Sequence, residues 1–126
     1  MKILLVDDAA IVRMQLKHFI EKELQHEVIA EACNGLEAIK LYGKYEPDVT
    51  ILDLTMPVMD GFQAFSRIKA EDPNAKIVIY SAIQEESKLN SLKEQGAKFF
   101  LEKPLQLSDL SDLKKLRDTL DAAAAS

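Results

Sequence analysis

Short apolar runs alternate along this chain with longer segments that have helical periodicity. The runs lie at residues 3–6, 49–52, 77–80 and 99–101. Apolar runs of this length are typical of parallel strands that helices cover on both faces. A fifth segment, residues 27–32, alternates between two faces of which one carries acidic side chains, and this pattern predicts a strand at the edge of the sheet.

Helical spacing fills the intervals between these strands. Apolar stripes occur at residues 12, 16, 19 and 20; 38, 39 and 42; 64, 65 and 68; 89, 92 and 96; and 110, 113, 116 and 120. Ser108 is expected to cap the last helix, because its hydroxyl can accept a hydrogen bond from a free backbone N–H. Five strands that alternate with five helices predict an α/β protein, a flavodoxin-like (βα)5 doubly wound sandwich with a parallel sheet of order 2-1-3-4-5.

Length and composition restrict the class of protein further. A chain of 126 residues predicts one domain, over residues 1–121, followed by an Ala-rich tail at 122–126. The tail is interpreted as a frayed helix end, the start of a linker, or a remnant of an expression vector. A net charge of −5 argues against a nucleic-acid surface, and no apolar stretch is long enough to span a membrane. The single cysteine, Cys33, fits a reducing cytoplasm.

Polar side chains follow four of the five predicted strands. Asp7 and Asp8 follow the first strand, Asp53 the third, Ser81 ends the fourth, and Lys103 follows the fifth. Ligands in an open parallel sheet bind beyond the carboxyl ends of the strands, where the strand order reverses. Three carboxylates at one crevice need a cation or shifted pKa values, and hard oxygen ligands of this kind suit Mg²⁺.

Phosphoryl transfer needs a nucleophile, charge neutralisation and positioning. The Asp53 carboxylate would supply the nucleophile, giving an aspartyl phosphate, while the Lys103 ammonium would supply countercharge and the Ser81 hydroxyl a hydrogen bond. The chain has no Walker A loop, no GxGxxG loop and no Ser-His-Asp or Cys-His arrangement. The sequence therefore predicts phosphoryl transfer to an aspartate rather than nucleotide binding.

These residues, taken in order, resemble the signature of response-regulator receiver domains of two-component signalling (the CheY-like family). The matching positions are Asp7-Asp8, Asp53, Thr55-Met56-Pro57, Asp60-Gly61, Ser81-Ala82 and Lys103-Pro104. Each piece is common by itself, but the whole set, each piece at a strand end, is specific. The similarity extends from Lys2 to about Leu120.

The resemblance implies a role for each acid. Asp53 would be the phosphoacceptor, receiving the group from a sensor histidine kinase, a phosphotransfer protein or a small phosphodonor. Asp8, Asp53 and the backbone carbonyl of Thr55 would bind Mg²⁺ directly, and Asp7 would act through water. The chain would not be an enzyme in the usual sense, since it would catalyse only its own phosphoryl transfer and dephosphorylation.

The resemblance also implies a switch. Ser81 and Lys103 would hold the transferred group, and the Lys103–Pro104 peptide bond would be cis. Ser81 and Phe100 would then change the face built from the fourth helix, the fifth strand and the fifth helix, where a downstream target protein binds. The protein would be a monomer or a phosphorylation-dependent dimer. A core role for Phe100 and a backbone-bonded hydroxyl for Ser81 are the simpler alternatives.

Other functions stay open at this point. A stand-alone messenger is favoured, and a receiver domain cut from a larger multidomain regulator is the alternative. A Mg-dependent aspartyl-phosphate phosphatase of the haloacid-dehalogenase type carries a second aspartate two residues after the first, where this chain has Thr55. An adaptor with an inactive site is the third class. Glu102 is expected to pair with a basic neighbour, and His18 and His26 are expected on the exposed side of the first helix.

Overall fold

Five parallel strands form one sheet at the centre of the computed structural model, which describes residues 1–126. The strands are β1 Lys2–Val6, β2 Glu27–Ala32, β3 Val49–Leu52, β4 Ile77–Ser81 and β5 Phe99–Glu102. Their order is β2-β1-β3-β4-β5, which confirms the predicted flavodoxin-like topology and the edge position of β2.

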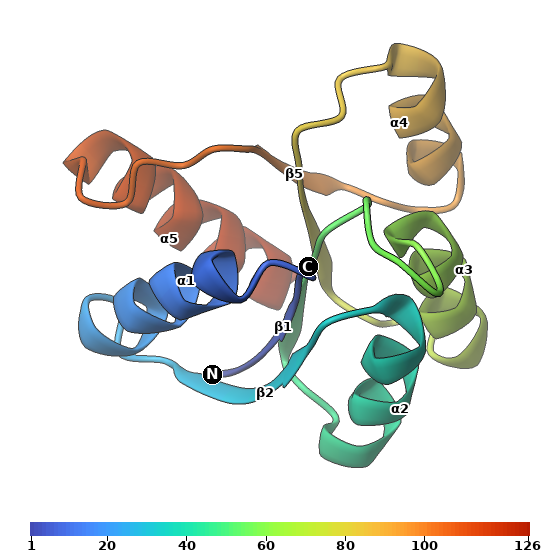
Figure 1. Ribbon diagram of the computed structural model, residues 1–126, viewed down its shortest axis with the longest axis horizontal. Helices are drawn as coiled ribbons and strands as arrows, with labels where there is room; N and C mark the ends of the chain where they lie inside the picture. The colour runs from blue at the N-terminus through green and yellow to red at the C-terminus, as the bar shows by residue number, and fades with distance from the viewer.

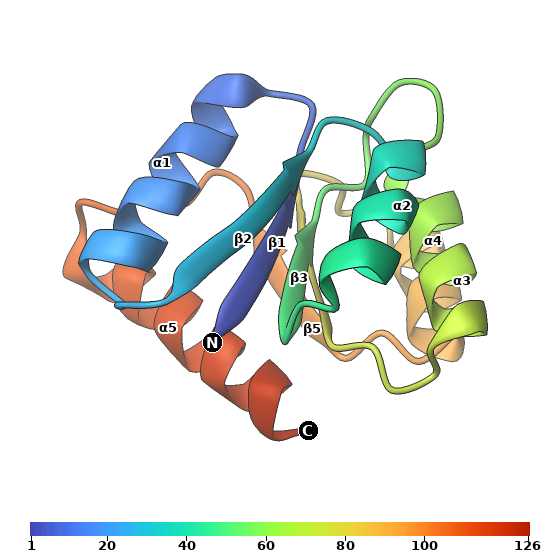
Figure 2. The same cartoon turned by 90° about the horizontal axis from the view of Figure 1, so that it is seen from below.

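Helices cover both faces of this sheet. They are α1 Ala10–Lys22, α2 Gly35–Tyr45, α3 Gly61–Glu71, α4 Glu86–Glu94 and α5 Leu110–Ala125. Figure 1 shows α1 and α5 on one side of the strands and α2, α3 and α4 on the other. Figure 2 looks at the same three layers from below. No helix is both long and apolar enough to cross a membrane.

Two hydrophobic cores lie on the two faces of the sheet. Successive side chains of a strand point to opposite faces. Leu4 of β1 therefore belongs to the core under α2, α3 and α4, whereas Leu5 belongs to the core under α1 and α5. All five residues of β4 are buried. The apolar runs are thus covered on both sides, as their sequence predicts.

The last helix differs from its sequence-based description. Asp109, not Ser108, caps α5, because its carboxylate accepts the backbone N–H of Ser111 at 2.8 Å, directly before the first helical residue. α5 continues through the Ala-rich residues to Ala125. Ala123 is fully buried against the core that α1 and α5 share.

The two histidines also lie in different surroundings. His18 is exposed on α1 as expected. The prediction for His26 is wrong, because α1 ends at Lys22 and His26 is half-buried in the connection to β2. Its Nδ1 lies 3.0 Å from the amino group of Met1, and burial is the main cause of a lowered His26 pKa.

Candidate functional site

Three aspartates meet at the carboxyl ends of β1 and β3. Asp7 and Asp53 directly follow these neighbouring strands and are 2% and 5% exposed, while Asp8 is exposed. One carboxylate oxygen from each of the three lies within 4.8 Å of the others. The structure therefore brings together the acids that the sequence places at adjacent strand ends.

Backbone hydrogen bonds fix where these acids leave the sheet. The Asp53 N–H donates to the carbonyl of Val6 at 2.9 Å, and the Asp7 N–H donates to the carbonyl of Ala32 at 3.0 Å. Both bonds continue the parallel ladder by one residue beyond the strands. The two carboxylates consequently start from ordered backbone at the same edge.

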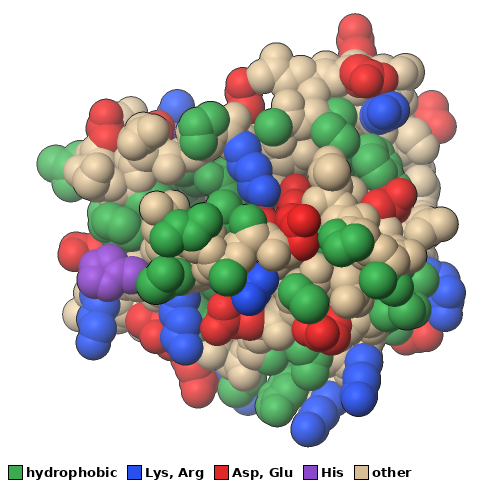
Figure 3. Space-filling view, viewed as in Figure 1, with side chains coloured by type: hydrophobic (Ala, Val, Ile, Leu, Met, Phe, Trp, Pro, Cys, Tyr) green, Lys and Arg blue, Asp and Glu red, His purple; other side chains and the backbone are tan.

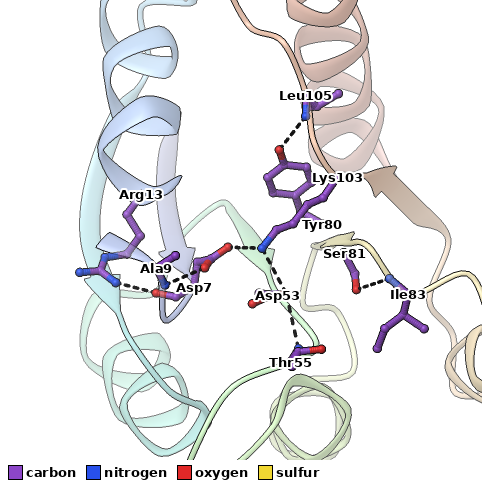
Figure 4. A network of polar contacts seen from close by, with 10 residues as sticks. All are labelled: Asp7, Ala9, Arg13, Asp53, Thr55, Tyr80, Ser81, Ile83, Lys103 and Leu105. Atoms are coloured by element: carbon purple, nitrogen blue, oxygen red, sulfur yellow. Dashed lines mark hydrogen bonds and ion pairs between the residues drawn. The ribbon is translucent and has the colours of Figure 1, made fainter. Parts of the chain in front are cut away.

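The Asp7 side chain is held firmly. Its Oδ1 accepts the N–H of Ala9 at 2.9 Å, and its Oδ2 accepts the Lys103 ammonium at 2.6 Å. The guanidinium of Arg13 also donates to the Asp7 carbonyl at 2.6 Å. Both carboxylate oxygens of Asp7 are thus already engaged by the protein (Figure 4).

Lys103 follows β5, the edge strand opposite β2, and brings a positive charge to the acids. Its Nζ lies 3.4 Å from Asp53 Oδ1 in addition to its contact with Asp7, and its side chain is 19% exposed. The peptide bond between Lys103 and Pro104 is cis. In the space-filling view of Figure 3 the site opens on the face turned to the viewer, with acidic and basic side chains side by side.

Burial and neighbouring charges shift the pKa values of two of these groups. Burial raises the pKa of Asp53, and the nearby charge of Asp7 raises it further, against an opposing effect of Lys103. Burial alone would lower the pKa of Lys103, but its hydrogen bond to Asp7 and the charge of Asp53 outweigh that effect and raise it. The site therefore carries more negative charge than one ammonium neutralises.

The loop after Asp53 returns closely to the strand end. The Thr55 N–H donates to Asp53 Oδ1 at 3.4 Å, and the Gly61 N–H donates to the carbonyl of Leu54 at 2.9 Å. A Cβ atom on Gly61 would lie only 2.0 Å from the Asp53 carbonyl oxygen. Asp60 caps α3 by accepting the Gln63 N–H at 2.9 Å. Glycine is thus needed at position 61 for α3 to begin against the acidic site.

Ser81 and Phe100 flank the site on the side of α4. The buried Ser81 Oγ accepts the N–H of Ile83 at 3.0 Å, and Phe100 is half-buried with the Lys93 ammonium 5.5 Å from its ring centroid. Both residues line a cavity of about 390 Å³ between the β4–α4 connection and β5. The cavity leaves room beside the phenylalanine ring.

Two contacts of the site region were not foreseen from the sequence. The prediction of a basic partner for Glu102 is wrong, because Glu102 Oε1 accepts a hydrogen bond from the side-chain amide of Gln84 instead. The hydroxyl of Tyr80 accepts the N–H of Leu105 at 3.0 Å, and the Lys103 Nζ lies 5.3 Å from the Tyr80 ring centroid. The only feature of the sequence that could have indicated these Tyr80 contacts is the position of a tyrosine directly before Ser81.

Fold and site together define a class. The molecule is a doubly wound α/β domain whose sheet edge presents three acids and one lysine, and this set of groups suits a divalent cation beside an anionic group. Residues 3–115 match the response regulator receiver domain. The chain belongs to the response regulator receiver family.

Individual relatives support this assignment. The chain is 44% identical over 106 residues to the chemotaxis protein CheY of Listeria monocytogenes, covering 84% of this chain and 88% of that protein. It is also 44% identical over 107 residues to CheY of Thermotoga maritima, covering 85% and 88%. The crystal structure of the CheX–CheY–BeF3–Mg complex from Borrelia burgdorferi is similar, with a TM-score of 0.83, 32% identity, and 93% and 87% of the two chains covered.

Membership fixes the general function. Receiver domains of the CheY-like response regulators are signalling proteins that take up a phosphoryl group on an aspartate with Mg²⁺. The carboxylate cluster of this chain offers the oxygen ligands that such a cation prefers.

Proposed function

We propose that this protein is a phosphorylation-switched signalling protein in which Asp53 accepts the phosphoryl group. The observation that carries the proposal is the position of Asp53, which lies within 4.8 Å of Asp7 and Asp8 and 3.4 Å from the Lys103 ammonium. No other part of the chain brings three metal-ligating side chains together.

The hydrogen bonds distinguish Asp53 from its neighbours. Asp53 uses only Oδ1 in its contacts with Lys103 and Thr55, so its Oδ2 has no protein partner. The only fully buried side-chain oxygen or nitrogen without a partner is Thr50 Oγ1, so Asp53 Oδ2 is still accessible to solvent. Asp53 Oδ2 is therefore free to act as a nucleophile, whereas both oxygens of Asp7 are engaged.

The same pattern assigns the residues that would hold Mg²⁺. Asp8 makes no side-chain hydrogen bond or ion pair, and Oδ1 of Asp53 makes only contacts of 3.4 Å, so both residues can bind the ion directly together with the Thr55 carbonyl. Asp7 would act through water because Lys103 and Ala9 occupy its oxygens. When bound, the ion neutralises the charge of the acids and of the phosphoryl oxygens.

Phosphoryl transfer then follows from the chain's own residues. Asp53 Oδ2 attacks the phosphorus, and the bond from phosphorus to the histidine nitrogen of a sensor kinase or phosphotransfer protein breaks, its electron pair leaving with the nitrogen. Lys103 pairs with one phosphoryl oxygen. The Ser81 hydroxyl donates a hydrogen bond to another, which is possible because its Oγ only accepts from Ile83. The protein would catalyse only this transfer and the later hydrolysis of the aspartyl phosphate, in which water attacks the phosphorus, the bond to Asp53 breaks and inorganic phosphate leaves.

The switch would act through the cavity beside Phe100. A phosphoryl group adds nearly two negative charges at neutral pH, which attract the Ser81 hydroxyl. Its displacement opens space toward the 390 Å³ cavity, and Phe100 can turn into it. The α4-β5-α5 face would thereby change its population of conformers and bind a downstream target in the cytoplasm, as a monomer or as a phosphorylation-dependent dimer.

One incubation tests the proposal. The protein is treated with Mg²⁺ and acetyl phosphate and its intact mass is measured, alongside Asp53→Asn and the exposed control Asp118→Asn. A single phosphoryl adduct in the wild type and the control, absent from Asp53→Asn, is expected. Catalytic phosphate release from unrelated monoesters would indicate a phosphatase instead, and no adduct in any variant would indicate an adaptor.

A further inference from the structure

Tyr80 occupies an unusual position for a polar aromatic side chain. It precedes Ser81 on β4, so its side chain points to the opposite face of the sheet, into the core under α1 and α5. Tyr80 is 5% exposed, and burial raises the pKa of its hydroxyl, which stays protonated at neutral pH. A buried tyrosine hydroxyl normally needs a hydrogen-bond partner.

The partner comes from the segment that carries Lys103. The Tyr80 hydroxyl accepts the N–H of Leu105 at 3.0 Å. Two other bonds enclose this one: the Lys103 N–H donates to the Ser81 carbonyl, and the Gln106 N–H donates to Asp112 Oδ2. Pro104 has no N–H to contribute. Tyr80 therefore supplies the hydrogen bond that ties the segment after Pro104 to the central sheet.

The ring of the same tyrosine contacts the ammonium group of Lys103. The Lys103 Nζ lies 5.3 Å from the ring centroid, within the range in which an ammonium is attracted to an aromatic face. Tyr80 thus contacts the residues on both sides of Pro104, with its hydroxyl on Leu105 and its ring beside Lys103. Figure 4 shows this arrangement next to Asp7 and Asp53.

We propose that Tyr80 is a positioning residue for Lys103. Its hydroxyl fixes the backbone that follows Pro104, and its ring contacts the Lys103 ammonium. Together these contacts keep the ammonium between Asp7 and Asp53. The consequence for phosphoryl transfer rests on the function proposed above for Asp53. The positioning itself can be measured in the unphosphorylated protein.

Three variants test the inference. Tyr80→Phe removes the hydroxyl and keeps the ring, while Tyr80→Leu removes both. Tyr42→Phe is the matched control, because it removes a tyrosine hydroxyl bonded to Asp72 at 2.7 Å on the far side of the molecule. Two quantities are recorded for each protein, at a temperature at which every variant is folded. They are the rate of phosphorylation by acetyl phosphate with Mg²⁺ and the NMR signal of the Lys103 ammonium. Lys103→Gln identifies the ammonium signal.

Tyr80→Phe is expected to slow phosphorylation about fivefold and Tyr80→Leu about tenfold, because a lost hydrogen bond of this kind is worth roughly 1 kcal/mol and the ring contact adds to it. The Lys103 signal should move in Tyr80→Phe, which keeps the ring, because loss of the bond to Leu105 lets the segment and its ammonium shift. A purely structural role of Tyr80 would leave that signal in place. Tyr42→Phe should match the wild type in both readouts.

Wild-type rates in both Tyr80 variants, together with an unmoved Lys103 signal in Tyr80→Phe, would overturn the inference. If Tyr80→Leu does not fold, Tyr80→Phe decides by its rate, since it changes only one hydroxyl. A wild type that forms no adduct would refute the role of Asp53, whereas the Lys103 signal in Tyr80→Phe would still decide whether Tyr80 positions Lys103.

Discussion

The Lys103 ammonium binds Asp7 at 2.6 Å, although the two residues are 96 positions apart in the chain. Asp7 follows β1 and Lys103 follows β5, and β3 and β4 separate these strands in the sheet. The contact therefore spans the carboxyl edge of the sheet, and it couples the charge balance of the site to the stability of the fold.

Removing the Lys103 charge should destabilise the protein when no divalent ion is present. Lys103→Met leaves Asp7 and Asp53 buried together without their countercharge, and breaking a buried ion pair in this way costs about 3 kcal/mol. Urea unfolding at neutral pH in EDTA measures the free energy of unfolding. Lys115→Met, which removes the exposed partner of a pair with the half-buried Asp112, is the control and should change it by less than about 0.5 kcal/mol.

The cost of Lys103→Met should also depend on pH in a defined direction. The folded-state pKa of Lys103 is raised, so its stabilising contribution is complete below the ordinary lysine pKa of 10.5 and is lost as the pH rises through the raised value. As the pH falls through the raised pKa of Asp53, this carboxylate becomes protonated and the cost shrinks. A cost that stays constant from acid to alkaline pH would contradict this account of the ion pair.

Asp53→Asn should have the opposite effect on stability. The folded-state pKa of Asp53 is raised, so the fold disfavours its charged form, and stability is lost as the pH rises from the ordinary value through the raised one. The variant should therefore be more stable than the wild type at neutral pH in EDTA, and the difference should disappear in acid.

Mg²⁺ should reverse the order of these two proteins. An ion that binds only the folded state at a hundred times its dissociation constant adds about 2.7 kcal/mol, and Asp53→Asn has lost one ligand and should gain less. Thermal unfolding with and without Mg²⁺ measures both values. Equal gains in the two proteins would argue against Asp53 as a metal ligand.

The sequence predicts the scaffold of this site better than its contacts. The bounds of β2 and β3 agree with the apolar patterns, because burial on one or both faces leaves a direct trace in residue type. The choice of Asp109 over Ser108 as a cap depends on where the chain enters α5, which composition does not determine. Two neighbouring cap-forming residues are equivalent in the sequence.

The same limit applies within the site. Strand-end positions place Lys103 near the acids, but they do not say that it binds Asp7 more closely than Asp53. The partner of Glu102 was expected to be basic, yet the structure places the neutral amide of Gln84 beside it. Pairings between distant residues depend on side-chain geometry that only the folded chain establishes.

The contact between Gln84 and Glu102 should restrain the proposed switch. It joins the β4–α4 connection, which directly follows Ser81, to the end of β5 beside Phe100. Glu102→Ala removes a surface hydrogen bond worth about 0.5–1 kcal/mol, so beryllofluoride with Mg²⁺ should bind roughly threefold more tightly. Isothermal titration calorimetry measures the affinity.

Charge loss alone is controlled by Glu94→Ala, which removes an exposed carboxylate at the end of α4. Gln84→Ala should reproduce the effect of Glu102→Ala, and the double variant should add little, because both changes break the same bond. Unchanged affinity in both single variants would mean that the bond does not restrain the activated conformation.

Two glycines offer a direct test of how α3 holds the phosphoacceptor loop. Gly61→Ala places a Cβ atom 2.0 Å from the Asp53 carbonyl oxygen and 2.6 Å from Leu54 Cα, and neither backbone atom can move without displacing the end of β3. The variant should lose about 3 kcal/mol of stability and slow the phosphorylation of Asp53, since the strand end and the start of α3 are pushed apart.

Gly43→Ala is the control. It has nothing within 4 Å of its new Cβ atom in α2, so it should gain about 0.5–1 kcal/mol and keep the wild-type rate. Urea unfolding and the acetyl phosphate assay measure both quantities, and a Gly61→Ala protein with wild-type stability would show that the close approach of α3 to Asp53 is not required.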